Sequence, residues 1–262
     1  MSLVAQRWNQ NGKVIILSET TDEPLTFAGQ VAGVPWNSDT TDHKKNFKRG
    51  VDCYMSGHWR VLEYPQIYMI LDGWSAKCIR EWYTHIIDTT RLQASTRYIN
   101  YDNFEYVTPR DIKANDAAKN AYVGLMENIN ETMKYLGELG IKKEDASEVL
   151  PLSYSTKIVV RVGMRELINI MEQRLCSRAY WEIRQLCNEI LDALRIYSDE
   201  WKWCIDDLEM FVPKCVRHIY CTEKNSCGRM PSYSKVRQLV ENNRLKEEKV
   251  VSNTQPKRGE TK

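Results

Sequence analysis

The segment Thr156–Val162, TKIVVRV, limits the possible folds more than any other part of this 262-residue sequence. It alternates and is rich in β-branched residues, which is typical of a strand. Three helical segments follow it in direct succession, at about 164–175, 178–196 and 198–210. Because strands and helices do not alternate with the regular spacing of a doubly wound sheet, we expect an α+β fold.

Two more strands are predicted, at Lys13–Leu17 and Tyr64–Leu71. A helix is expected directly after the second of these strands, with Asp72 as its cap. Four apolar residues recur there at helical spacing: Trp74, Cys78, Ile79 and Trp82. Weaker helical segments are predicted at 23–34, 41–55 and 143–149.

The longest predicted helix, Asp116–Leu139, is amphipathic and is followed by Gly140 as its stop. We expect one stripe of its apolar residues to face the core: Ala121, Leu125, Ile129, Met133 and Leu136. After Pro231 the composition changes. We therefore expect a domain over residues 1–230 and a helical or disordered tail over residues 231–262, with Val251–Lys262 disordered.

Charge and composition exclude several classes of function. The 37 basic and 35 acidic residues give a net charge of +2, which creates no global field for nucleic acid. The apolar run Val14–Leu17 is too short for a signal peptide or a membrane span, so we expect a cytoplasmic protein without a membrane partner. We expect free thiols, and Cys215, Cys221 and Cys227 lack the close spacing of zinc ligands, so no metal site is predicted.

No glycine-rich dinucleotide fingerprint, phosphate-binding loop, H-E-x-x-H or G-x-S-x-G sequence is present, so any nucleotide must be held by side chains. The stretch from Arg80 to Tyr101 offers such side chains. In an extended segment Gln93, Ser95 and Arg97 point to the same side, where an amide, a hydroxyl and a guanidinium suit a phosphate or a pyrimidine edge. The alternative is a solvated strand edge, with Arg97 paired to Asp102 or Glu105.

The same stretch resembles the signature of the flavin-dependent thymidylate synthases. Residues 80–86, REWYTHI, are similar to that family's R-Q-W-F-R-H-R, and residues 93–98, QASTRY, to its E-x-S-x-R-Y. Further landmarks follow the family's order: Ser56-Gly57-His58 with Leu62-Glu63, Val149-Leu150-Pro151-Leu152, Arg165-Glu166-Leu167 with Asn169 and Arg174, Trp181-Glu182-Ile183-Arg184, and the segment Cys215–Gly228. Together they cover about residues 13–230.

The resemblance implies a central, mostly antiparallel sheet flanked by long helices. It also implies methylation of dUMP at C5 to give dTMP, with methylenetetrahydrofolate as carbon donor and reduced FAD as hydride source. NADPH would re-reduce the flavin. The family implies a homotetramer whose active sites lie at subunit interfaces.

The resemblance also implies roles for individual residues. The substrate nucleotide would be held by Glu81, Gln93, Ala94, Ser95, Thr96, Arg97 and Arg174. The catalytic role would fall to Arg174, against the pyrimidine, where a fixed positive charge stabilises the charge that develops during attack. The residues expected to contact FAD are His58, Thr84, His85, Ile86, Arg91, Arg165 and Asn169.

The sequence departs from the family at functional positions. Thr84 and Ile86 replace two arginines expected at the FAD pyrophosphate, and Arg91 is a candidate replacement. Glu81 and Gln93 exchange an amide and an acid, while Ser147 and Gly163 replace an arginine and an asparagine. Two other functions therefore stay open: C5 methylation or hydroxymethylation of a different pyrimidine nucleotide, and a non-catalytic nucleotide-binding or interaction protein. Without the resemblance, Arg165 and Arg174 would be taken for surface charges on a helix.

Overall fold

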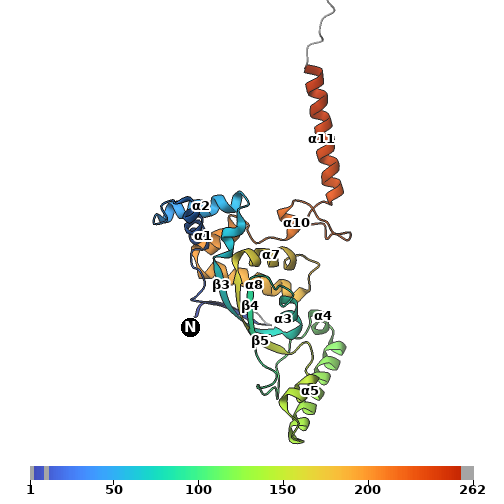
Figure 1. The fold of residues 1–262 in the computed structure, drawn as a ribbon. Coiled ribbons are helices and arrows are strands. Elements are labelled where there is room, and N and C mark those ends of the chain that lie inside the picture. Colours follow the sequence, from blue (N-terminus) through green and yellow to red (C-terminus); the bar gives the residue numbers. More distant parts are fainter. Residues whose placement is uncertain (1–2, 9–11, 255–262) are drawn as a thin grey trace, which may run out of the picture.

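The computed structural model describes the backbone of residues 3–8 and 12–254 and the side chains of residues 12–244. Its five named strands are β1 (Leu3–Trp8), β2 (Lys13–Leu17), β3 (Gln66–Ser75), β4 (Thr89–Gln93) and β5 (Ser155–Gly163). They form one sheet in the order β1-β2-β3-β5-β4, and every neighbouring pair is antiparallel. The α+β prediction, the antiparallel sheet and the strand at 156–162 are confirmed (Figure 1).

Along the sequence, helices lie between the strands and after the last strand. The first group is α1 (Pro24–Gly33), η1 (Val34–Trp36), α2 (His43–Met55), η2 (Trp59–Glu63) and α3 (Ala76–Trp82). The middle group is α4 (Arg110–Lys113), α5 (Asp116–Glu138), α6 (Lys143–Ala146) and η3 (Ser147–Val149). The last group is α7 (Met164–Arg174), α8 (Trp181–Tyr197), α9 (Asp199–Asp206), α10 (Lys214–Arg217) and α11 (Tyr233–Thr254).

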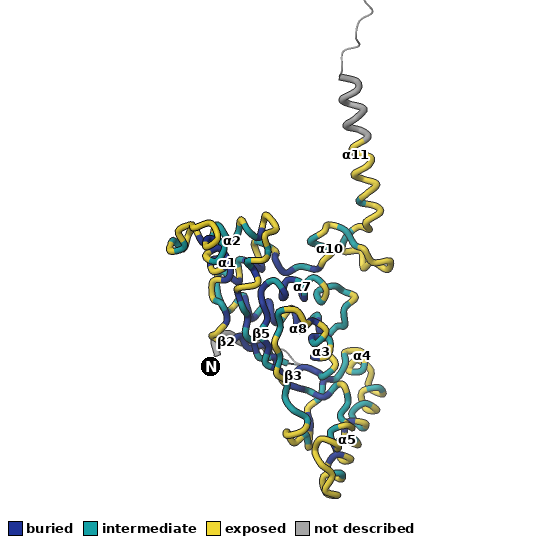
Figure 2. Tube along the Cα trace, in the orientation of Figure 1, coloured by how far each residue is buried: buried dark blue, intermediate teal, exposed yellow. Residues whose placement is uncertain are grey.

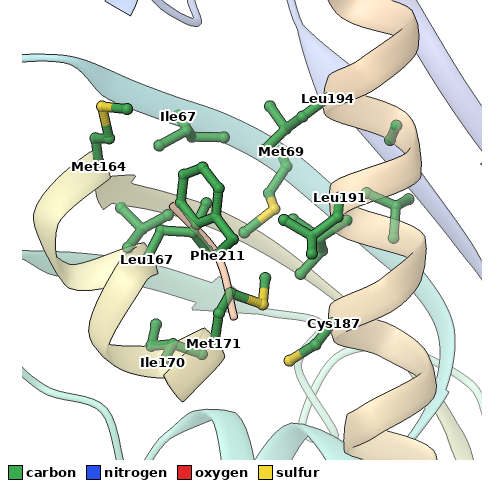
Figure 3. Packing of buried hydrophobic residues seen from close by; sticks show 14 of the residues in the cluster. Ile67, Met69, Met164, Leu167, Ile170, Met171, Cys187, Leu191, Leu194 and Phe211 are labelled. Carbon is green, nitrogen blue, oxygen red and sulfur yellow. The ribbon is translucent and has the colours of Figure 1, made fainter. Parts of the chain in front are cut away.

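One face of the sheet carries the main core. Alternate residues of β3 and β5 are fully buried there, and helices α7 and α8 cover them. Figure 3 shows Ile67 and Met69 of β3 facing Leu191 and Leu194 of α8, with Phe211 filling the space beside α7. This packing fixes α7 against the end of β5, and it therefore fixes the position of the polar residues that α7 carries.

The helix after β3 begins later than predicted. Asp72 and Trp74 lie in β3, since a register shift at Gly73, which has a φ of +82°, lets the strand continue to Ser75. The cap is Ser75, whose hydroxyl accepts from the Cys78 backbone N–H at 3.0 Å. Asp72 pairs instead with two lysines, Lys13 and Lys157.

The predicted core stripe of α5 is confirmed at Met133 and at the partly buried Ile129, but it is wrong at Leu125. Leu125 is 52% exposed, and the buried residues of this helix are Met126 and Met133. They pack in a small separate cluster with Phe104 and Tyr154. Since Leu125 and Met126 are both apolar, the sequence pattern alone does not select the helix face.

The C-terminal helix α11 extends away from the rest of the chain (Figure 1), and its described side chains are almost all exposed (Figure 2). An exposed helix after Pro231 is therefore confirmed. The predicted disorder of 251–262 is wrong for 251–254, which are helical, and residues 255–262 lie outside the described part. The domain division at residue 230 stays a prediction. Within the described residues, no helix combines the length and the apolarity that a membrane span requires.

Candidate active site

A tight turn presents the first group of site residues. Helix α3 ends at Trp82, and the His85 backbone N–H then donates to the Trp82 carbonyl at 3.1 Å. The chain enters β4 at Thr89 after Asp88, which has a φ of +45°. Helix end, turn and strand start thus place residues 81–88 close to the C-terminal half of α7.

Arg174, the last residue of α7, joins this turn through four hydrogen bonds. Its guanidinium donates to the Glu81 carboxylate at 2.9 Å, the Glu81 carbonyl at 3.3 Å, the Thr84 hydroxyl at 2.7 Å and His85 Nε2 at 2.9 Å. Only 17% of the Arg174 side chain is exposed. The interpretation of Arg174 as a surface charge is therefore wrong, because α7 packs this end against the turn. We call Arg174, Glu81, Thr84 and His85 the Arg174 cluster.

His85 is the buried acceptor of this cluster, with 6% of its surface exposed. Burial, followed by the charge of Arg174, lowers its pKa to about 4, so the ring is neutral at neutral pH. Because Nε2 accepts from Arg174, the ring proton lies on Nδ1. That atom faces the carboxylate of Glu166 at 3.9 Å, and burial raises the Glu166 pKa.

The remaining candidates for FAD lie around the same helix. Asn169 donates to the second oxygen of Glu166 at 3.0 Å, so it is linked to His85 through that carboxylate. Arg165, one turn earlier, pairs with Glu63 at 2.5 Å at the end of η2, and both side chains are exposed. His58 is exposed at the start of η2 and contacts the Ser56 hydroxyl at 3.0 Å.

Arg91 points into the turn and not outward. Its guanidinium donates to the carbonyls of Tyr83 at 3.1 Å and His85 at 2.7 Å, and it stacks on the Tyr83 ring. Ile86 is 73% exposed. In this conformation Arg91 stabilises the turn that carries His85, and the two positions where the family has arginines, Thr84 and Ile86, present no charge.

The second group of site residues lies after β4. The strand ends at Gln93, whose amide donates to the Thr156 hydroxyl at 3.2 Å. Ala94 still bonds to the Lys157 carbonyl, but residues 96–98 form a turn, so the predicted extended segment through Arg97 is wrong. The cause is local. The Ser95 hydroxyl accepts from the Arg97 backbone N–H at 3.2 Å, and the Ser95 carbonyl accepts from Ile99, which together close the turn.

Arg97 pairs with Glu144 of α6 at 3.1 Å, with 64% of its side chain exposed. The predicted alternative partners, Asp102 and Glu105, are therefore wrong in this structure. Thr96 is half-buried in the same turn. The short helix α6 also brings Lys143 to the Tyr98 carbonyl at 3.4 Å. We call residues 93–97 with Glu144 the Arg97 turn.

The two groups lie at opposite ends of β4. Thr89 pairs with Val162 and Gln93 with Ile158, so β4 runs along β5 between them. Four residue steps of a strand span about 13 Å. In the part of the chain that the structure describes, no hydrogen bond or ion pair joins the Arg174 cluster to the Arg97 turn. Within one chain, the two groups of candidate residues are therefore separate.

Gly163, where the family has asparagine, has a local explanation. A Cβ at this position would lie 1.7 Å from Asp88 Oδ2, so the glycine makes room for that carboxylate. The other oxygen of Asp88 accepts from Arg161 at 2.8 Å. The Ser147 hydroxyl donates to the Glu144 carbonyl at 3.0 Å, within its own segment.

Sequence reasoning missed three acidic partners: Glu166, Glu144 and Asp88. Glu166 lies one turn from Asn169 and Ile170 and is buried among apolar neighbours. Its place on the apolar face of the helix can be recognised in the sequence. No such pattern marks Glu144 and Asp88, because the arginine that each binds lies more than forty residues away in the sequence.

Comparison with known proteins gives a consistent result. The family model described as thymidylate synthase complementing protein matches residues 16–196. A flavin-dependent thymidylate synthase of Nitratidesulfovibrio vulgaris is 32% identical over 193 residues, which cover 67% of this chain and 73% of that protein. The enzyme of the same name from Thermococcus kodakarensis is 33% identical over 226 residues, which cover 81% of this chain and 90% of that protein.

The fold is similar to a crystal structure of thymidylate synthase X from Helicobacter pylori with FAD and dUMP. The TM-score is 0.58 at 22% identity, covering 74% of this chain and 99% of that chain. The residues that the family model matches include the Arg174 cluster, the Arg97 turn and strands β3, β4 and β5. The chain belongs to the thymidylate synthase complementing protein family, among whose members are the flavin-dependent thymidylate synthases.

Proposed function

We propose that this protein methylates dUMP at C5 to give dTMP, as an FAD-dependent enzyme. The observation that carries the proposal is the Arg174 cluster, in which a guanidinium is fixed by three neighbouring side chains in a chain of this family. A preorganised positive charge stabilises the negative charge that develops on a pyrimidine during attack at C5, because no reorganisation is needed. Arg174 is therefore assigned to the pyrimidine ring.

The phosphate is assigned to the Arg97 turn. Ser95 supplies a hydroxyl, and Arg97 supplies paired donors once Glu144 is displaced. The Arg174 cluster and the Arg97 turn are thus two half-sites, and they lie at opposite ends of β4. One nucleotide is therefore held by two copies of the chain. This division supports a homotetramer with active sites at subunit interfaces.

Four residues are assigned to FAD: His58, His85, Arg165 and Asn169. The exposed His58 and Arg165 offer N–H groups to acceptor atoms of a flavin and its phosphates, while those of His85 and Asn169 are directed at Glu166. Their positions along η2, the turn and α7 fit one elongated ligand. Thr84 and Ile86 add contacts without charge. Arg91 stabilises the turn by donating to the carbonyls of Tyr83 and His85. When bound, the reduced cofactor supplies the hydride that completes the methyl group.

Methylenetetrahydrofolate is assigned as the carbon donor and NADPH as the reductant. We place the enzyme in the cytoplasm, where nucleotide and folate pools are found. The neutral ring of His85 is suited to this site, because it accepts from Arg174 while its Nδ1–H faces Glu166. It thus keeps the guanidinium oriented without adding a second positive charge.

A second acceptor nucleotide is favoured by one observation. Glu81 accepts from Arg174 at 2.9 Å where the family has a glutamine, so this position presents acceptors alone. A carboxylate there suits a base edge that carries an amino group, as in dCMP, better than an amide does.

The test begins with colour. The purified protein should take up FAD and turn yellow, and it should release tritium from C5-labelled dUMP when folate and reductant are present. Replacing dUMP with UMP or dCMP identifies the acceptor. Arg91→Ala should weaken FAD binding about tenfold by loosening the turn, with the exposed Arg80→Ala as control. Colourless protein without FAD uptake would refute the proposed function.

A further inference from the structure

A pocket of about 550 Å³ lies on the far side of Arg174. The end of α7, the connection to α8 and the segment 213–227 form its walls. Four of the eight free cysteines line it: Cys176, Cys215, Cys221 and Cys227. Cys176 comes from a position about forty residues before the other three, so the fold brings these thiols together and local spacing does not.

The thiols of this pocket influence one another. Burial raises the pKa of Cys215, and the thiols of Cys221, Cys176 and Cys227 contribute to its electrostatic surroundings. Cys227 differs from Cys215, because it is exposed and its pKa is lowered by the Ser177 hydroxyl and then by the Arg229 backbone N–H. An accessible thiol with a lowered pKa, in one pocket with other thiols, is the arrangement in which oxidation is site-selective.

Metal binding is the competing use of four thiols. Among the residues that the structure describes, no group of three or more histidine, cysteine or carboxylate side chains is arranged to hold a metal ion. Two neighbouring thiols suffice for a disulfide, whereas a structural zinc site needs four ligands at fixed distances. The arrangement around Cys215 therefore favours oxidation.

We propose that Cys227 is an oxidation site that forms a disulfide with one of the three other thiols of this pocket. Hydrogen peroxide is the oxidant. The Cys227 thiolate attacks one peroxide oxygen, so that an S–O bond forms, the O–O bond breaks and hydroxide leaves. A second thiolate then attacks the Cys227 sulfur; the S–S bond forms, the S–O bond breaks and hydroxide leaves again. Two thiols lose two electrons, and with their two protons the peroxide becomes two waters.

The bridge has a consequence for the active site. Arg174 lines this pocket on one side and is held by Glu81 and His85 on the other. A disulfide draws the segment 213–227 toward the bridge and thereby shifts Arg174, which lines the same pocket, from the position in which Glu81 and His85 hold it. This part of the inference rests on the proposed function, while the disulfide itself does not.

The experiment treats the full-length protein with a small excess of hydrogen peroxide and maps its peptides under non-reducing conditions. The expected result is a loss of two hydrogens per chain, with Cys227 joined to Cys176, Cys215 or Cys221. Cys227→Ser should abolish the bridge, and Cys53→Ser, which removes a cysteine outside the pocket, should leave it unchanged. A Cys227 that stays reduced, or that is oxidised only to sulfinic acid, overturns the proposal. So does a metal ion that copurifies with the chain and protects the four thiols.

A second readout separates the two proposals. dUMP turnover should fall at least threefold after peroxide treatment, recover with dithiothreitol, and resist peroxide in Cys227→Ser. Turnover that is unchanged by a bridge at Cys227 overturns the coupling to Arg174. If untreated protein shows no turnover, the proposed function fails while the disulfide map still decides the oxidation site.

Discussion

The Arg174 cluster and the Arg97 turn differ in how far the chain itself completes them. Arg174 has four hydrogen bonds and is mostly buried, whereas Arg97 has one ion pair and is mostly exposed. A buried, fully bonded guanidinium is costly to disturb, while an exposed pair contributes about 0–1 kcal/mol. The first half-site is thus formed before any ligand arrives, and the second is held by a carboxylate that an anionic ligand can displace.

The largest expected effect comes from removing Arg174 from its preformed cluster. Arg174→Ala should lower turnover by about 100- to 1,000-fold, because it removes the fixed charge at the pyrimidine. It should also lower the thermal unfolding midpoint, since the partners in the cluster lose their donor. Arg195→Ala is the control, as Arg195 has two ion pairs outside the site. Turnover that survives in Arg174→Ala would remove this residue from the mechanism.

The second-largest expected effect is a pH dependence of stability, which comes from His85 in the Arg174 cluster. The pKa of His85 is lowered to about 4 in the folded chain, against about 6.5 when unfolded, so the unfolded state binds more protons as the pH falls through this window. The free energy of unfolding should drop by about 2 kcal/mol between pH 7 and pH 5 on this account.

Urea unfolding at the two pH values measures that difference. His85→Gln should lose most of it, because an amide oxygen can accept from Arg174 but does not titrate. Other charged groups face His85, namely Glu81, Arg91 and Glu166, and the raised pKa of Glu166 acts in the opposite sense. An equal pH dependence in wild type and His85→Gln would show that His85 does not supply the effect.

A smaller effect is expected in the exposed half. Arg97→Ala should weaken dUMP binding about tenfold and leave the unfolding midpoint unchanged, because its single ion pair is solvated. Calorimetric titration with dUMP and thermal unfolding measure the two quantities. A large loss of stability without a loss of affinity would reverse the roles of the two half-sites.

The smallest expected effect is a gain in affinity for dUMP at the Arg97 turn. Glu144→Gln should strengthen dUMP binding about threefold, because it removes the carboxylate that competes for Arg97. Glu148→Gln, an exposed acid on the same segment, should change nothing. Weaker binding in Glu144→Gln would mean that the carboxylate orients Arg97 for the ligand.

The same contrast explains what the sequence could predict. The strand at 156–162 has a clear period of two, and Arg174 follows a recognisable series of residues on α7. The predicted stripe of α5 includes the buried Met133 but takes Leu125 in place of Met126. Ser75 is not predicted as a cap, because it depends on Glu182, 107 residues away. The segment at Ser95 is predicted to be extended, since a period of two assumes that the strand continues. Residue types at the site were thus predictable, but their partners were not.

The most direct test of the account asks whether one nucleotide is held by two copies of the chain. Two variants, Arg97→Glu and Arg174→Ala, are co-expressed with different tags, and mixed oligomers are purified. If the half-sites come from different copies, random assembly restores about a quarter of the sites with both arginines, and turnover at low dUMP returns to about that fraction of wild type. Turnover no higher than that of either variant alone would contradict the account, because it would mean that both arginines must come from the same chain.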